Sequence, residues 1–150
     1  MNIADVIDKD LIKVPLESTD KLGIITELVD VLAKAKKYTP EQRKTVLDAV
    51  LKREELGSTG IGKGICIPHA KTTSVKAIRL VIGISRIPID FGSPDGEKSR
   101  MFFLVLAPED AASAHVELLA SIARTCSSPL FRRLLEQAKQ PDEVYRLFMD

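Results

Sequence analysis

The spacing of hydrophobic residues predicts two helices in the first third of the chain. Within residues 19–37, apolar positions recur at helical spacing with charged residues between them: Leu22, Ile25, Leu28, Val29, Leu32 and Ala35. Residues 39–42 read Thr-Pro-Glu-Gln, which supplies an N-cap, a proline at the first helical position and a capping-box glutamine. A second helix therefore begins there and ends near Gly57, and its apolar face comprises Val46, Leu47, Val50 and Leu51.

Continuous apolar runs predict strands in the middle of the chain. Residues 80–84 and 101–106 are too uniformly apolar for strands with one solvated face, so both are expected in a sheet that is covered on two faces. Residues 11–16 form a possible edge strand. The segment from Pro88 to Gly96 has the composition of turns.

A glycine-rich segment, Gly57–Gly64, precedes a further short strand. We expect a loop there, then a strand at residues 65–67 that stops at Pro68, because proline cannot donate to a strand ladder. On this strand Cys66 points away from the face that its two neighbours use, and Pro68 interrupts the alternation before His69. His69 therefore follows both a strand and a glycine-rich loop, where scaffolds hold functional side chains.

The last third of the chain is predicted to be helical. One apolar helical face is formed by His115, Leu118, Leu119, Ile122, Ala123 and Cys126. Pro129 and Pro141 each occupy a position where a further short helix can begin. The order of two helices, strands and further helices predicts a single α/β domain over residues 1–150, a three-layer sandwich with a mixed β-sheet flanked by helices on both faces.

Composition narrows the classes of function. Hydrophobic residues make up 45% of the chain and charged residues 29%, which is ordinary for a globular protein. Lys plus Arg number 22 against 21 Asp plus Glu, so no basic surface is expected for nucleic acid or an anionic membrane. No apolar run approaches the roughly 20 residues of a membrane span, and no secretory signal is evident. We expect a cytoplasmic protein whose Cys66 and Cys126 are free thiols.

The glycine-rich segment partly matches a nucleotide-binding loop. Gly57–Lys63 satisfies the first seven positions of the pattern G-x-x-x-x-G-K-[ST], but the eighth position is Gly64. The hydroxyl that would hold magnesium is therefore missing, and the segment lies between a helix and a strand, whereas a nucleotide loop follows a strand and precedes a helix. We expect a flexible connection, whose glycines also allow the backbone to come close to a bound group.

Other readings of the histidines and cysteines are weaker. Cys66 and His69 are too far in sequence from His115 and Cys126 to form a compact zinc signature, so no metal is expected. A Cys66 nucleophile remains an alternative, but a cysteine in the middle of a strand is more typical of a small buried hydrophobe. His115 lies on an apolar helical face, where it is either a core histidine satisfied by a hydrogen bond or a second functional histidine.

Several segments resemble a known family. Residues 53–70, from Arg-Glu-Glu-Leu-Gly to Ile-Pro-His-Ala, are similar to the active-site signature of enzyme IIA components of the bacterial phosphoenolpyruvate phosphotransferase system, fructose and mannitol type. Residues 89–96, 105–108 and 115–119 resemble the family's downstream segments, so the similarity covers essentially the whole chain. Cys66 stands where the family usually has alanine. Residues 53–60 and the ending 142–145 look most like the free-standing nitrogen-type regulatory branch.

The resemblance implies specific roles. His69 would carry a phosphoryl group, His115 would lie beside it, and Arg53 would reach the same pocket. No metal or cofactor is needed, because the incoming phosphoryl group already sits on a histidine of the phosphocarrier protein HPr. The acceptor would be a regulatory target protein or, in a sugar-specific branch, an enzyme IIB. A third alternative is a regulatory binding module that has lost phosphotransfer.

The residue types suit this chemistry. A neutral imidazole, with a pKa of about 6.5, is a competent nucleophile near neutral pH. Phosphoryl transfer passes through a loose, in-line transition state, so the protein mainly has to position groups and stabilise charge. Arg53 would do so as a guanidinium donor and His115 as a hydrogen-bond donor. The loop residues that are candidates to add further donors from their backbone amides are Ser58, Thr59, Gly60 and Gly62.

Overall fold

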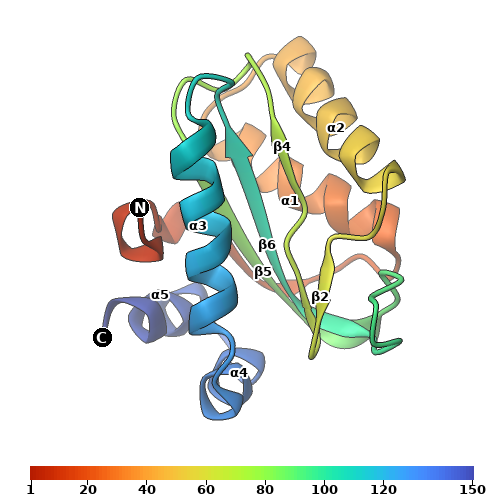
Figure 1. The fold of residues 1–150 in the computed structure, drawn as a ribbon, viewed down its shortest axis with the longest axis vertical. Coiled ribbons are helices and arrows are strands. Elements are labelled where there is room, and N and C mark those ends of the chain that lie inside the picture. The colour runs from red at the N-terminus through yellow and green to blue at the C-terminus, as the bar shows by residue number, and fades with distance from the viewer.

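The computed structural model describes residues 1–150 as three layers, helices on either side of one sheet (Figure 1). One face carries α1 (Lys21–Ala35) and α2 (Pro40–Glu55). The other face carries α3 (Ala112–Thr125), α4 (Pro129–Glu136) and α5 (Pro141–Met149), next to the 3-10 turns η1 (Ile3–Asp5) and η2 (Lys9–Leu11). The predicted fold class, a three-layer α/β sandwich, is confirmed.

The sheet is mixed, as predicted. Its six strands are β1 (Ile12–Leu16), β2 (Gly60–Gly62), β3 (Ile65–Cys66), β4 (His69–Lys71), β5 (Arg79–Ile89) and β6 (Ser99–Ala107). They run in the order β1-β5-β6-β3-β2, and β4 also pairs with β6. The pairs β1–β5, β3–β6 and β4–β6 are parallel, whereas β5–β6 and β2–β3 are antiparallel. β6 is therefore paired along both of its edges.

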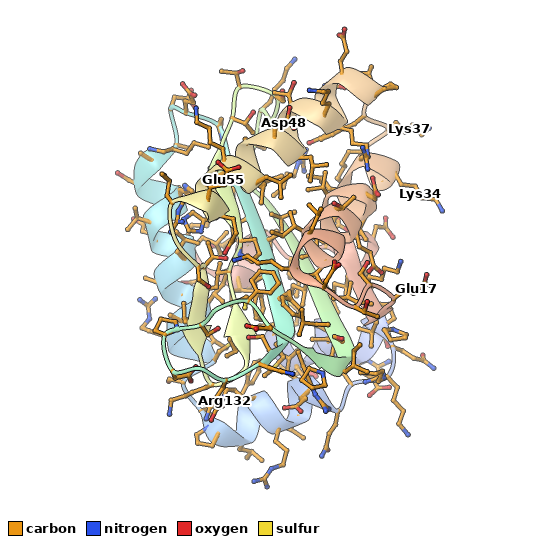
Figure 2. The ribbon with its side chains drawn as sticks, turned by 90° about the vertical axis from the view of Figure 1, so that its right-hand side faces the viewer. Glu17, Lys34, Lys37, Asp48, Glu55 and Arg132 are labelled. Atoms are coloured by element: carbon orange, nitrogen blue, oxygen red, sulfur yellow. The ribbon has the colours of Figure 1, made fainter.

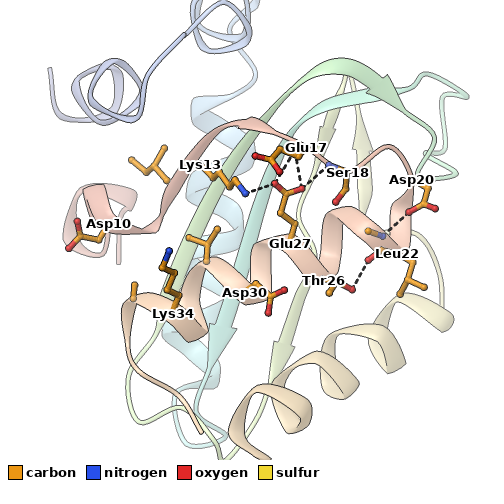
Figure 3. Close-up of a pocket in the computed structure, with 14 residues that line it drawn as sticks. Asp10, Lys13, Glu17, Ser18, Asp20, Leu22, Thr26, Glu27, Asp30 and Lys34 are labelled. Carbon is orange, nitrogen blue, oxygen red and sulfur yellow. Dashed lines mark hydrogen bonds and ion pairs between the residues drawn. The ribbon is translucent and has the colours of Figure 1, made fainter. Parts of the chain in front are cut away.

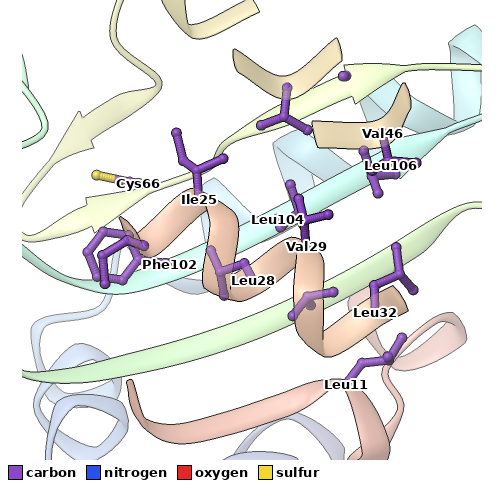
Figure 4. Close-up of a cluster of buried hydrophobic side chains, with 14 of the residues drawn as sticks. Leu11, Ile25, Leu28, Val29, Leu32, Val46, Cys66, Phe102, Leu104 and Leu106 are labelled. Atoms are coloured by element: carbon purple, nitrogen blue, oxygen red, sulfur yellow. The ribbon is translucent and has the colours of Figure 1, made fainter. Parts of the chain in front are cut away.

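Alternate residues of β6 serve two separate hydrophobic cores. Phe102, Leu104 and Leu106 are fully buried on the side of α1 and α2 (Figure 4). Met101, Phe103 and Val105 are equally buried on the side of α3, α4 and α5. Successive side chains of a strand point to opposite faces of the sheet, so a central strand with helices on both sides must be apolar at every position. This explains the continuous apolar run at residues 101–106.

Strands β3 and β4 are two parts of one line of pairing along β6. Cys66 pairs with Phe102 and His69 with Val105, so the register is the same before and after Pro68. Pro68 has no N–H to donate, but its carbonyl accepts from Val105 N at 2.9 Å and keeps the two strands in line. The expectation that Pro68 interrupts the alternation before His69 is wrong, because pairing to β6 carries the alternation through the proline.

Three helices begin where the sequence predicted their first turns. Thr39 and Gln42 form a capping box at the start of α2, with distances of 3.1 Å and 2.9 Å. Pro129 and Pro141 open α4 and α5. Charged side chains, among them Glu17, Lys34, Asp48 and Glu55, are exposed on the outer surface (Figure 2). Three residues that were predicted to lie on buried apolar helix faces are exposed instead: Leu22, Ala35 and Ala123.

Two segments differ from the sequence prediction. The expected loop Gly57–Gly64 contains β2, which forms a hairpin with β3 through a turn with positive φ at Gly62, Lys63 and Gly64. Glycines gave this strand no apolar alternation to detect. The segment beginning at Pro88, expected as turns, starts inside β5, because a register shift after Ile84 lets the strand continue past the proline.

The close approach of β2 to the chain near Ser93 yields a stability prediction. A Cβ at Gly60 would lie 2.0 Å from Ser93 Oγ and 3.1 Å from Ser93 Cα. Gly60→Ala is therefore expected to lower the free energy of unfolding by about 1–3 kcal/mol in urea denaturation. In a Ser93→Gly background, Gly60→Ala should lower the free energy of unfolding by less than it does in wild type, because the side-chain atoms that would clash are absent. An unchanged urea midpoint in Gly60→Ala would show that this contact is not tight.

Candidate functional site

The structure brings together the two histidines that the sequence singled out. His69 opens β4 and, because the strand alternation continues through Pro68, shares the face of Ile65 and Ile67, which is covered by α3. His115 lies in the first turn of α3 and is only 5% exposed. The ring centroids are 5.5 Å apart, and the rings meet edge to face at 72°. Half-buried His69 and buried His115 therefore form a pair at the junction of β4 and α3.

A backbone carbonyl sets the protonation of the His69 ring. Nδ1 lies 2.8 Å from Ile67 O, and since a carbonyl can only accept, Nδ1 carries the hydrogen and donates it. Burial lowers the pKa of His69 below its usual value, and the charge of Arg53 lowers it further. The hydrogen bond to Ile67 and the charge of Glu54 raise the pKa, but not enough to cancel this shift. At neutral pH the ring is thus neutral, and Nε2 has a free lone pair.

His115 is a buried base with an unpaired nitrogen. Its Nε2 has no hydrogen-bond partner, although buried polar atoms are almost always paired. Burial, followed by the charges of His69 and Lys71, lowers the pKa of His115 to about 4. One of the two interpretations of His115 was a core histidine satisfied by a hydrogen bond. The side chain does face the core, but no hydrogen bond satisfies Nε2. This unpaired nitrogen beside His69 favours the alternative reading, a second functional histidine.

Arg53 lies in the last turn of α2, close to the same site. Its Nη1 donates to Gly57 O at 2.9 Å, and its charge contributes to lowering the pKa of His69. Arg53 is half-buried as a residue, its guanidinium makes an exposed hydrogen bond, and no carboxylate holds it in an ion pair. Arg53 is therefore a cation near His69 whose single hydrogen bond is to the adjacent loop.

The loop residues are engaged with one another and with neighbouring segments. Thr59 N donates to a carboxylate oxygen of Glu54 at 2.9 Å, and Gly60 N donates to Ser58 Oγ at 3.0 Å. Ser58 Oγ in turn donates to Phe91 O at 2.6 Å. The amides of Thr59 and Gly60, which we expected as candidate donors to a bound phosphoryl group, are thus already used inside the fold. Gly62 belongs to β2 and is buried in the hairpin.

Sequence reasoning missed Glu54 and Lys21. The Glu54 side chain is 5% exposed, and its Oε2 lies 2.8 Å from Lys21 Nζ at the start of α1. Neighbouring Glu55 is exposed (Figure 2). A signal was present, because Glu54 continues the buried face of α2 that contains Val46 and Val50 at intervals of four residues.

A large surface groove lies away from the two histidines and has a structural explanation. It measures about 970 Å³ and runs between β1 and α1 (Figure 3). Within it, Glu27 accepts from Lys13 Nζ at 2.8 Å and from the backbone amides of Glu17 and Ser18. None of the histidines lines this groove. Its polar groups close the connection between β1 and α1.

The cysteines are free and lie in different cores. Cys66 faces α1 and α2, whereas Cys126 lies on the side of α3. Burial raises the pKa of the Cys66 thiol to about 11, and its Sγ lies 3.1 Å from Ser99 Oγ. A nucleophilic role needs the thiolate, which is disfavoured here. No group of three or more histidine, cysteine or carboxylate side chains is arranged to hold a metal ion, and no helix is long and apolar enough to cross a membrane.

The chain is an α/β sandwich in which a neutral, half-buried histidine lies beside a second, buried histidine. This combination of fold and site can now be compared with known protein families. The family model described as "Phosphoenolpyruvate-dependent sugar phosphotransferase system, EIIA 2" matches residues 5–150. The chain belongs to this family.

Relatives include both regulatory and sugar-specific proteins. The chain is 33% identical over 145 residues to a nitrogen regulatory protein of Bradyrhizobium diazoefficiens, covering 97% of this chain and 93% of that one. It is 37% identical over 144 residues, 96% of its own length, to the fructose-specific EIIABC component of Bacillus subtilis, of which it spans only 22%. The structure of the nitrogen regulatory protein IIA-Ntr from Neisseria meningitidis matches with a TM-score of 0.88 and 28% identity, over 97% and 98% of the two chains.

The lowered pKa of His115 predicts how stability depends on pH. The unfolded chain binds a proton to this ring below a pH of about 6.5, whereas the folded chain does so only near pH 4. The stability contributed by neutral, buried His115 is therefore present above the unfolded pKa and is lost as the pH falls toward 4. As the pH falls, wild type should lose up to about 3 kcal/mol more stability than His115→Gln, which has no ionisable ring at this position.

Urea unfolding of wild type and His115→Gln between pH 7.5 and pH 4.5 measures the effect. Acidic residues titrate in both proteins and cancel in the difference. Parallel curves for the two proteins would contradict the lowered pKa of His115.

Proposed function

We propose that this chain is a phosphocarrier that accepts a phosphoryl group on Nε2 of His69 from the phosphohistidine of HPr. The observation that carries this proposal is the 2.8 Å contact between Nδ1 and Ile67 O, which leaves Nε2 as the unprotonated nitrogen of a neutral ring. The neighbouring His115 ring adds a buried nitrogen, Nε2, that has no hydrogen-bond partner within the protein. Membership of the EIIA 2 family supports the same reaction.

The proposed step is an in-line transfer between two nitrogens. The lone pair of His69 Nε2 forms the new N–P bond while the N–P bond to the donor imidazole breaks. The donor ring, which is protonated on its other nitrogen, keeps the electron pair of the broken bond and leaves as neutral imidazole, and the positive charge passes to the phosphorylated His69 ring. The proton on Nδ1 stays in its bond to Ile67 O. His115 acts as a neutral hydrogen-bond donor to the phosphoryl oxygens. Arg53 supplies positive charge after leaving Gly57 O, which solvent can satisfy.

We further propose that the carrier is regulatory and binds target proteins according to its phosphorylation state. Support comes from the similarity to the nitrogen regulatory protein IIA-Ntr, with a TM-score of 0.88 and 28% identity, compared with 0.79 and 21% for a mannitol IIA from Escherichia coli. The alternative is a sugar carrier that passes the group to an enzyme IIB. A mannitol IIA from Escherichia coli, similar in fold at a TM-score of 0.78, is known in complex with phosphorylated enzyme IIB.

Phosphorylation is tested with phosphoenolpyruvate, enzyme I and HPr, read by intact mass. We expect wild type to gain one acid-labile phosphoryl group and His69→Ala to gain none. His115→Ala and Arg53→Ala should still be phosphorylated, but about 100-fold to 1000-fold more slowly, because each loses a donor to developing charge. Phosphorylation of His69→Ala would exclude the assignment. A wild type that captures partners without any mass shift would instead indicate a binding module that has lost phosphotransfer.

The regulatory branch predicts a partner that distinguishes the two states. Phosphorylation adds roughly 1.5 to 2 negative charges to the surface around His69, and an unpaired charge buried in an interface costs several kcal/mol. A target that fits the unphosphorylated form should therefore bind it at least about ten-fold more tightly, or about 1.4 kcal/mol. Pull-downs should show that wild type and His69→Ala keep this partner and that His69→Asp loses it. Equal capture by all three, with rapid discharge to an enzyme IIB, would favour the sugar carrier.

A further inference from the structure

A continuous series of contacts joins the start of α1 to the imidazole of His69. Lys21 Nζ lies 2.8 Å from Glu54 Oε2. The Glu54 carboxylate accepts from Thr59 N at 2.9 Å and from Thr59 Oγ1 at 2.6 Å. Thr59 O accepts from Ile67 N at 3.0 Å, and Ile67 O accepts from His69 Nδ1 at 2.8 Å. Each link is a hydrogen bond or an ion pair between groups that are distant from the surface or only partly exposed.

Glu54 is the fixed point of this series. Its carboxylate is buried and receives three donors, two from Thr59 and one from Lys21. Hydrogen bonds to a charged group are shorter and stronger than neutral ones. Lys21 is itself held in place, because its Nζ also donates to Phe91 O at 3.3 Å and lies 5.1 Å from the centre of the Phe91 ring. The pair therefore ties α1, α2 and the segment after α2 into one rigid corner.

Ile67 needs this support because it lies in a gap of the sheet. β3 ends at Cys66 and β4 begins at His69, so Ile67 belongs to neither strand, and Pro68 has no N–H. The Ile67 N–H finds its partner in Thr59 O, while Pro68 O accepts from Val105 N at 2.9 Å. On the β2 side, Ile67 is thus held by one hydrogen bond, from its N–H to Thr59 O. This bond helps to fix the position of the Ile67 carbonyl, which in turn orients the His69 ring.

We infer that Lys21 and Glu54 are positioning residues, which hold Thr59 and, through it, the Ile67 carbonyl, so that His69 keeps its hydrogen on Nδ1 and presents Nε2. Neither residue contacts the His69 ring in a hydrogen bond. The inference deepens the proposed function, but its first readout, the tautomer of His69, is measured on the unphosphorylated protein and does not depend on phosphotransfer.

Glu54→Gln is the direct test. The amide keeps the size of the side chain but replaces one accepting oxygen with an NH₂ group, which then faces donors from Thr59 or Lys21. We expect ¹⁵N NMR of the imidazole at about pH 8, where the ring is neutral, to show a loss of the Nδ1–H tautomer relative to wild type. Single-turnover transfer from phospho-HPr should fall by on the order of 10-fold to 100-fold, as a displaced nucleophile predicts.

Glu27→Gln is the matched control. Glu27 is also a largely enclosed carboxylate, with a side chain 10% exposed, which binds a lysine and backbone amides, but it joins β1 to α1 away from the histidines. This variant should lose stability and keep the wild-type tautomer and transfer rate. Lys21→Arg, which retains the charge, should resemble wild type more closely than Lys21→Met.

Thr59→Val gives a milder second test in case Glu54→Gln does not fold. It removes only the Oγ1 bond and keeps the backbone bond to Glu54, so a smaller shift in the same direction is expected. A wild-type tautomer in Glu54→Gln, or in Thr59→Val if the first variant is unfolded, would overturn the inference. Loss of the Nδ1–H tautomer in a protein whose wild type accepts no phosphoryl group would support the inference and overturn the proposed function.

Discussion

The pairing of β6 along both of its edges is the constraint on which the rest of the structure depends. β5 occupies one edge, and β3 followed by β4 occupies the other. Because β6 is buried on both faces, it fixes where two independent cores begin and which residues of its neighbours enter each core. His69 takes its direction from this pairing, since its partner Val105 already lies in the core beneath α3.

The site is therefore assembled by three separate devices. Sheet register directs His69 toward α3, the first turn of α3 brings His115 against it, and the end of α2 contributes the charge of Arg53. Burial keeps both rings neutral, which is the form in which an imidazole nitrogen can attack or donate without an added proton. The cost is a polar atom without a partner in the interior, a feature more typical of sites of chemistry than of cores.

Much of the fold was predictable because local rules and tertiary structure agree. The capping box at Thr39, the prolines that open α4 and α5, and the apolar run of β6 all indicated the right elements. The hairpin in Gly57–Gly64 was not predictable from hydrophobic alternation, because glycine has no side chain to alternate. The proximity of His69 and His115 came from family resemblance alone, since residues far apart in sequence meet only through the sheet. Glu54 was missed because a charged residue near a helix end is ordinarily solvated.

The uninterrupted register across Pro68 also fixes a length of chain. With both Cys66 and His69 paired to β6, the two residues between them span the gap without changing the parity of the strand. One residue more or fewer would turn the imidazole through the sheet into the apolar layer under α1 and α2, away from His115. Substitutions at Ile67 and Pro68 change the quality of the site, whereas an insertion or deletion there removes it, so the spacing carries more information than the identity of either residue.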